Sequence, residues 1–302
     1  MRSPVLHAKQ NGIAVITAIL IAAIVASLAF ALSTRERFWL NQTENHKDLA
    51  AAQAVAFGAI DLARLTLRDD MRNNSVDHLL EPWTIPIPPI NVEEGKVAGR
   101  LIEIQGRFNL FNLQSGGKAS PTGIAILKSL LATRSLSTDW AEKMATAMAS
   151  QVAIGLKNNP GLSGNKLFPL ANLAELAELA GIDATQLATL ESILTILPES
   201  TSVNVNFAPP EVLAAVTPGL SVSEAEQIVS QRAEKHFNSV QDYTNALPER
   251  LRALVNTSAY TVESQYFLSE VDSWFGRAHA RFQAMIYRQR GKMPELLWAR
   301  RI

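Results

Sequence analysis

The chain has 302 residues with 28 basic and 28 acidic side chains, so its formal net charge at pH 7 is zero. A neutral chain lacks the broad positive charge that binding to nucleic acid favours, and 302 residues are enough for more than one hydrophobic core. The chain contains no cysteine, so no disulfide contributes to its stability.

The N-terminal region contains an apolar segment, residues 13–32, with no charge, proline or glycine. A helix over these residues would be about 30 Å long, the thickness of the hydrocarbon core of a bilayer. The twelve residues before it carry Arg2 and Lys9 and no acid. By the positive-inside rule this leader stays in the cytoplasm, and everything after residue 32 lies across the membrane.

Three interpretations of this N-terminus remain open. Cleavage of a signal peptide at Ala29-Phe30-Ala31 would release a secreted binding protein. Cleavage of a prepilin-type leader between Gly12 and Ile13 would keep the apolar helix, and an uncleaved anchor gives the same topology. The apolar run exceeds the 7–15 residues of a signal peptide, and the helical pattern continues beyond it, which favours the prepilin interpretation.

Residues 33–71 are expected to continue the same helix. They carry an alanine-rich apolar stripe at helical spacing, formed by Leu49, Ala52, Ala56, Ala59, Ala63 and Leu67. We expect one helix over about 13–70, half in lipid and half packed on a globular head. Two helices with a break in residues 41–45 are the alternative.

Strands are expected next. The proline-rich residues 82–89 end the helix and favour an edge strand, with Trp83 and Ile85 at the edge of a core. Residues 97–113 alternate around Gln105-Gly106 and predict two short strands, after which Gly116-Gly117 leaves the sheet.

A helical region follows and then strands return. Helical spacing is present in residues 124–131, 140–154, 170–180, 184–194, 210–216, 224–232 and 240–246. From residue 256 on, segments 265–275, 278–287 and 296–298 predict an antiparallel meander, with a turn at Gly276-Arg277. The predicted fold class is α+β, a long helix packed on a small antiparallel sheet that an all-helical domain interrupts.

Residues 212–232 are typical of a helix-hairpin-helix motif around Pro218-Gly219-Leu220. In DNA-binding versions the backbone amides of the hairpin meet phosphates. Residues 203–250 contain three basic and six acidic side chains, a balance of −3, which repels phosphate. We therefore expect the motif to pack or to bind protein, while a membrane-anchored DNA-uptake receptor remains the alternative.

The sequence does not indicate an enzyme. The five histidines, His7, His46, His78, His236 and His279, show no metal-ligand spacing. The sequence has no cysteine nucleophile, no G-x-S-x-G motif and no phosphate-binding glycine loop. No cofactor is evident from these residues.

Four stretches carry a resemblance to a known family. They are Lys9-Gln10-Asn11-Gly12 before Ile13, Gly106-Arg107-Phe108-Asn109-Leu110, SVNVNFAPPEVLAAV at 202–216, and QYFLSEVDSWFGRAHARFQAMIYR at 265–288. With them the chain resembles general secretion pathway protein K, the large minor pseudopilin of the bacterial type II secretion system, over nearly its whole length. The resemblance implies a leader (1–12), a transmembrane part (13–32), a pilin-like part (33–120), an inserted all-α, SAM-like domain (121–255) and C-terminal strands (256–302).

The resemblance also implies a function. A prepilin peptidase is expected to cut between Gly12 and Ile13 and to methylate the new amine of Ile13. The mature chain is expected in the inner membrane, single-pass, with its bulk in the periplasm. There it is expected at the tip of the pseudopilus, where it initiates filament assembly and acts in protein export across the outer membrane. The implied partners are the I-type and J-type minor pseudopilins, the major pseudopilin, secreted substrates and the secretin, with no nucleic acid.

Two features bear on this resemblance. Most pilin-like proteins carry a glutamate at the fifth mature position, where it neutralises the terminal amine of a neighbouring subunit; here that position is the uncharged Thr17. This fits a tip subunit, and a neutral lipid-facing residue is the alternative. Calcium is implied by the resemblance alone, because the comparable residues 148–161 hold no carboxylate and no ligand can be transferred. The asparagine pair of the family is altered, since Phe111 lies between Asn109 and Asn112.

Overall fold

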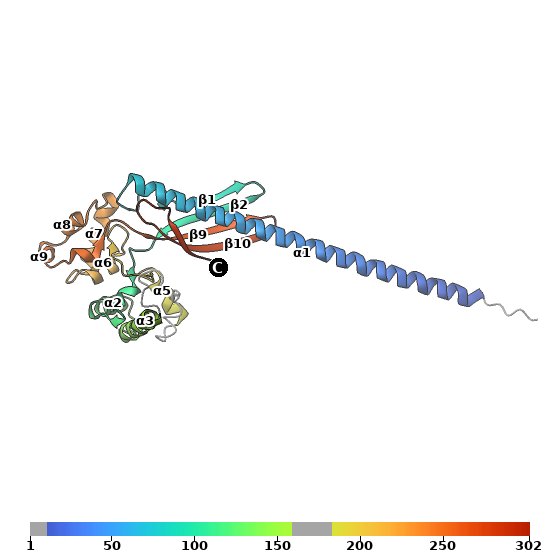
Figure 1. The fold of residues 1–302 in the computed structure, drawn as a ribbon, viewed down its shortest axis with the longest axis horizontal. Helices are drawn as coiled ribbons and strands as arrows, with labels where there is room; N and C mark the ends of the chain where they lie inside the picture. Colours follow the sequence, from blue (N-terminus) through green and yellow to red (C-terminus); the bar gives the residue numbers. More distant parts are fainter. Residues whose placement is uncertain (1–10, 159–182) are drawn as a thin grey trace, which may run out of the picture.

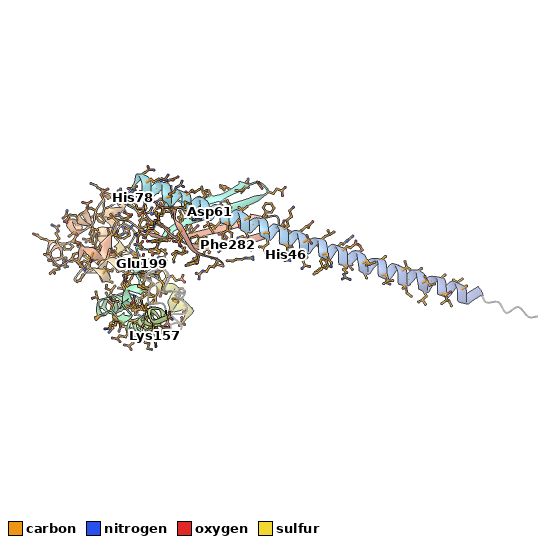
Figure 2. All side chains as sticks on the ribbon, in the orientation of Figure 1. His46, Asp61, His78, Lys157, Glu199 and Phe282 are labelled. Atoms are coloured by element: carbon orange, nitrogen blue, oxygen red, sulfur yellow. The ribbon has the colours of Figure 1, made fainter. Side chains whose placement is uncertain are left out.

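The computed structural model describes residues 11–158 and 183–302, and a long helix, α1 (Asn11–Asn73), dominates it (Figure 1). Its 63 residues make it about 95 Å long. The first half of α1 projects from the head with its side chains uncovered, and His46 lies close to where the head begins (Figure 2). Residues 41–45 are helical, so the alternative of a broken helix is wrong.

The predicted alanine-rich stripe is the face of α1 that packs on the head. Ala52, Ala56 and Leu67 are fully buried, and the other three stripe residues are half-buried. Ile60 joins them on the same face. Small side chains allow the helix backbone to approach the sheet closely, and the Ser273 hydroxyl donates to the carbonyl oxygen of Ala52 at 2.8 Å.

The head contains a five-stranded antiparallel sheet of order β1-β2-β9-β10-β11. Its strands are β1 (Ile87–Val92), β2 (Gly95–Glu103), β9 (Tyr266–Phe275), β10 (Ala278–Tyr287) and β11 (Glu295–Arg301). The predicted meander is therefore confirmed as β9, β10 and β11. Phe282 of β10 lies on the sheet face toward α1 (Figure 2). Ala284 shares that core, and the alternation of the strand puts Arg281 and Gln283 on the opposite face.

The proline-rich segment forms a 3-10 turn, η1 (Pro82–Thr84), and then the edge strand β1, as predicted. Trp83 is buried, but Ile85 is 68% exposed, so its predicted place at the edge of a core is wrong.

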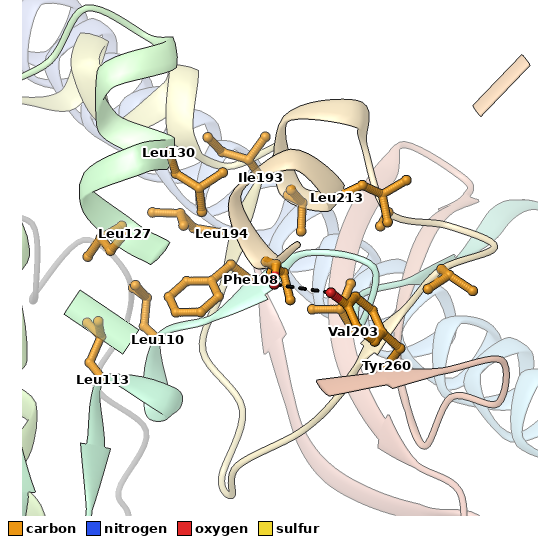
Figure 3. Packing of buried hydrophobic residues seen from close by; sticks show 14 of the residues in the cluster. Phe108, Leu110, Leu113, Leu127, Leu130, Ile193, Leu194, Val203, Leu213 and Tyr260 are labelled. Atoms are coloured by element: carbon orange, nitrogen blue, oxygen red, sulfur yellow. Dashed lines mark hydrogen bonds between the residues drawn. The ribbon is translucent and has the colours of Figure 1, made fainter. Parts of the chain in front are cut away.

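Residues 97–113 contain two strands on either side of a turn at Gln105-Gly106, as predicted, but the second strand does not join the sheet of the first. β2 pairs with β9, but the chain then leaves the sheet, and β3 (Phe108–Asn109) pairs in parallel with β6 (Leu194–Thr195). A 3-10 helix, η2 (Leu110–Leu113), follows. The reason is burial, because Phe108, Leu110 and Leu113 enter the core of the inserted region (Figure 3).

The inserted region contains seven described α-helices that share one core. They are α2 (Pro121–Thr133), α3 (Asp139–Asn158), α5 (Ala184–Leu190), α6 (Pro210–Val216), α7 (Val222–Glu234), α8 (Val240–Ala246) and α9 (Glu249–Arg252). Leucines of α2 and α6 meet the strand residues Phe108 and Val203 in this core (Figure 3). Side-chain caps begin several of the helices; Ser221 and Glu224, for example, form a capping box at α7.

The structure of the inserted region departs from the predicted one in two places. The helix expected over 184–194 ends at Leu190, because Leu194 pairs with Phe108 in β6. The region is not wholly helical, since β4 (Gln114–Ser115) pairs with β5 (Lys118–Ala119) beside it and β7 (Val203–Asn204) pairs with β8 (Tyr260–Thr261). A 3-10 turn, η4 (Thr257–Ala259), precedes β8. The helix expected over 170–180 lies outside the described residues.

Candidate functional site

The N-terminal processing residues lie in the first turns of α1. The helix begins at Asn11, so the backbone of Gly12 and Ile13 is already helical, and the leader residues 1–10 fall outside the described part of the chain. Thr17 lies one turn further on, and its hydroxyl donates to the carbonyl oxygen of Ala14 at 3.0 Å. This bond within the helix satisfies the hydroxyl in an apolar environment without adding charge.

The sheet is fixed to α1 where the helix reaches the head. The β9–β10 turn packs against Asp48, whose carboxylate accepts from the backbone N–H of Arg277 at 3.1 Å. Gly276 has φ +53°, which favours glycine, and a Cβ there would displace the Asp48 carboxylate from the turn. This contact is 16 residues beyond residue 32, which places it about 24 Å past the end of the apolar run.

At the far end of α1 a buried arginine joins three segments. The Arg288 guanidinium, at the end of β10, donates to Asp70 of α1 at 2.8 Å, to Asp77 at 2.7 Å and to the carbonyl oxygen of Ser264 at 2.8 Å. Its Cζ atom also lies 4.6 Å from the ring centroid of Phe267. Burial raises the pKa of Asp77 above its ordinary value, although the charge of Arg288 opposes this shift.

Within the described residues, one group of three carboxylates lies close enough together for a metal ion: Asp70, Asp77 and Glu81. Arg288 already supplies the positive charge there, and Glu81 accepts from the Asn74 amide at 2.7 Å. Burial raises the pKa of Glu81 to about 7. Calcium takes six to eight oxygen ligands. Because Arg288 and Asn74 already bind the oxygens of these carboxylates, the group does not fit calcium.

A second buried carboxylate holds together the two segments that flank the sheet strands β2 and β9. Glu103, at the end of β2, accepts from the backbone N–H groups of Gln105 at 2.7 Å and Gly106 at 2.9 Å, and from the Ser264 hydroxyl. Burial raises the pKa of Glu103 to about 7. A Cβ at Gly106 would lie 2.7 Å from the backbone of Phe207, so the Gly106-Arg107 motif makes a close backbone crossing at this joint.

Two histidines that are far apart in the sequence stack at the same joint. The rings of His78, just after α1, and His236, just after α7, have centroids 3.7 Å apart and an interplanar angle of 13°. Burial and the neighbouring His236 lower the pKa of His78. The sequence spacing gives no sign of this pair.

The asparagines of the family motif also hold this region together. The Asn109 side chain accepts from the N–H groups of Phe111 and Leu197 at 3.0 Å and donates to the Glu199 carbonyl at 2.7 Å. Asn112 donates to the Thr201 carbonyl at 2.9 Å. Both asparagines therefore fix the loop after β6 despite the phenylalanine between them.

The helix-hairpin-helix motif is formed by α6 and α7 with a turn at Gly219, where φ is +81°. Two of the three cations in residues 203–250 bind groups of the domain itself. Arg232 is buried and donates to the Val205 carbonyl, and Arg250 donates to Glu224 at 2.8 Å and to the Gly219 carbonyl at 3.3 Å. The hairpin where phosphate would approach is thus next to a carboxylate, which favours a packing role.

The sequence predicts a role for Gly12, Ile13 and Thr17, which the structure places in one helix, but it gave no indication of the residues that join the head to α1. Asp70, Asp77, Glu103 and Arg288 belong to four different segments, and long-range contact has no signature in spacing. The sequence feature that these four residues share is weak: each is a charged residue near the end of an apolar helix or strand.

Comparisons with known proteins agree on one family. A family model for type II secretion system (T2SS), protein K, matches residues 203–263. The type II secretion system protein K of Pseudomonas aeruginosa is 30% identical over 292 residues, covering 87% of this chain and 84% of the relative. The protein of the same name from Klebsiella pneumoniae is 26% identical, with 93% of each chain covered.

A solved structure shows the same fold. A chain in the crystal structure of the GspK–GspI–GspJ complex from the type 2 secretion system of enterotoxigenic Escherichia coli matches with a TM-score of 0.62 and 20% identity. The match covers 88% of this chain and 99% of that one.

The fold defines a class: a pilin-like α+β protein with one N-terminal helix apolar and long enough to cross a membrane, and a helical region inserted into its sheet. Within that class the chain belongs to the type II secretion system protein K family, the K-type minor pseudopilins. The matching relatives are components of a secretion system.

Proposed function

We propose that the protein is made as a prepilin, cut between Gly12 and Ile13, methylated at Ile13, and assembled as the tip subunit of the type II secretion pseudopilus. There it initiates the filament and acts in protein export across the outer membrane. Its apolar helix half lies in the inner membrane and its head in the periplasm. The single observation that carries the proposal is α1, one unbroken helix whose first half is bare and apolar and whose second half holds the head.

The joints described above support this proposal. Asp48 at one end and Arg288 at the other fix the head to the helix, so a pull on the membrane-spanning half is transmitted to the head. A signal-peptide cut at Ala29-Phe30-Ala31 would instead fall inside the continuous helix and remove its apolar half.

Two features support the proposed tip position. Thr17 is uncharged, so it cannot pair with the terminal amine of a further subunit, and an unpaired charge within hydrocarbon costs several kcal/mol. A tip subunit has no further subunit above it and needs no such charge. The inserted region gives the head a bulk that a subunit at the end of a filament can carry without meeting a neighbour above (Figure 1). The partners proposed from the relative are the I-type and J-type pseudopilins, since the matched structure is a GspK–GspI–GspJ complex.

The mature N-terminus tests this proposal. Co-expression with a prepilin peptidase is expected to give a membrane protein that has lost twelve residues and whose terminal Ile13 carries one methyl group, as read by mass spectrometry. Gly12→Val is the matched control, because it should leave the leader in place. A terminus at Leu32, or protein recovered without its apolar helix, would contradict the proposal. Co-purification with the I-type and J-type pseudopilins tests the assembly.

A further inference from the structure

The head contains a cleft of about 780 Å³ between the sheet and the inserted region. One wall is the sheet face turned away from α1, and the other carries α5 and β6. Apolar side chains cover both walls: Ile102, Leu268, Met285 and Trp298 from the strands, and Leu194 and Ile196 opposite. Such a surface suits a polypeptide with large apolar side chains.

The cleft also carries charges: three arginines and the carboxylates of Glu191 and Glu270, which leaves one net positive charge. Of its three arginines, Arg100 forms an ion pair with Glu270 at 2.6 Å. Arg300 lies over the ring of Trp298, with Cζ 4.9 Å from the centroid, and donates to the uncharged Gln283 amide at 2.6 Å. Both of these cations are exposed at the mouth of the cleft.

Arg107 differs from the other two. It is half-buried, and its guanidinium forms no hydrogen bond or ion pair with any residue in the described part of the chain. Loss of water lowers the pKa of Arg107, and the more distant charges of Glu103, Glu191 and Glu270 oppose this shift. A half-buried guanidinium whose donors find no partner in the described residues is well satisfied by a carboxylate, which can accept two of its hydrogen bonds.

The place of the cleft indicates where its occupant comes from. The strand residues that line the cleft lie on the sheet face opposite to the one packed on α1, on the side of the inserted region. In the proposed filament the subunits assemble through their long apolar helices, so a molecule entering the cleft approaches from the opposite, solvent-facing side.

We propose that this cleft binds an extended segment of an exported protein in which a carboxylate is flanked by large apolar side chains. The carboxylate lies against Arg107 and Arg300, and the apolar side chains lie on the floor formed by Met285 and Trp298. The inference rests on the proposed function, because that function brings exported proteins to the head.

Peptide binding to the full-length protein in nanodiscs tests the inference. Calorimetric titration compares a capped peptide, Ac-Leu-Glu-Phe-Asp-Leu-NH2, with its uncharged twin, Ac-Leu-Gln-Phe-Asn-Leu-NH2. We expect the acidic peptide to bind at least about tenfold more tightly, a difference that one charge-assisted hydrogen-bonded pair supplies. Arg107→Gln should remove the difference, Arg107→Lys should retain part of it, and the exposed Arg72→Gln should change nothing.

The inference is overturned if the acidic peptide does not bind, if both peptides bind equally, or if Arg107→Gln binds as the wild type does. Co-purification with the I-type and J-type pseudopilins separates this result from the proposed function. Assembly of Arg107→Gln at wild-type levels supports a cleft that is separate from the filament contacts. Loss of assembly by a variant with an unchanged melting temperature would make the occupant another pseudopilin and overturn the inference. Failure of the wild type to assemble would remove the proposed function, and with it the exported protein as the source.

Discussion

Replacing Arg288 with methionine tests how the head is held on α1. The arginine side chain is 2% exposed and pairs with Asp77, which is equally buried, and with Asp70. Methionine fills much of the same volume but leaves Asp77 as a buried carboxylate without its cation. Breaking a buried pair in this way costs about 3–5 kcal/mol. For a protein of this size, about 4 kcal/mol lowers the melting temperature by roughly 8–15 °C.

The assay is tryptophan fluorescence during thermal unfolding in detergent. The ring centroids of Trp83 and Phe267 are 5.3 Å apart, and Arg288 stacks over the Phe267 ring, so Trp83 reports on this site. The control is Arg290→Met, which removes a 61% exposed arginine paired with Glu263; exposed pairs contribute about 1 kcal/mol or less. Combining Arg288→Met with Asp77→Asn should cost less than the sum of the single changes, because the buried charge is then gone.

The stability of Arg288→Met should also depend on pH. The folded-state pKa of Asp77 is already raised, and it rises further without Arg288, so the stability of Arg288→Met should fall as pH rises through that pKa. The deficit relative to the wild type should therefore be smaller at low pH than at neutral pH. A loss below about 1 kcal/mol, or strict additivity with Asp77→Asn, would refute the account of Arg288 as the partner of a buried charge.

Three further predictions follow from the same packing. The pKa of Glu103 is raised from 4.5 to about 7, so its contribution to stability is fully present below pH 4.5 and is lost toward pH 7. This amounts to about 3 kcal/mol, and Glu103→Gln should give a flatter profile of unfolding against pH. Gly123→Ala should destabilise the protein by about 1–3 kcal/mol, because the new Cβ would lie 2.3 Å from the Asn112 carbonyl oxygen. The control is Gly58→Ala in α1, where the Cβ meets nothing within 4 Å and should stabilise the helix by about 1 kcal/mol. Thermal unfolding of the two variants measures the difference. Thr217→Val should cost about 1–3 kcal/mol in denaturant unfolding, because the Thr217 hydroxyl bonds the buried hydroxyls of Tyr243 and Tyr260, both at 2.8 Å; equal stability would show that the two tyrosines satisfy each other.

The sequence alone was sufficient for the elements with a long local pattern. The apolar run of residues 13–32 and the stripe from Leu49 to Leu67 predicted α1, because a helix repeats every 3.6 residues. Alternation over residues 278–287 predicted β10 and its neighbours in the same way, and the candidate residues Gly12, Ile13 and Thr17 needed no more than position along one helix. The helix expected over 210–216 has the observed bounds of α6.

Tertiary structure decided what depends on partners distant in the chain. Residues 108–113 continue the pattern of β2, yet they leave the sheet because the core of the inserted region buries Phe108 and Leu110 more completely. Arg288, the His78–His236 stack and the cleft around Arg107 bring together segments separated by more than 80 residues. Local periodicity records which face of an element is buried, whereas the identity of the neighbour on that face is set by the packing of the whole chain.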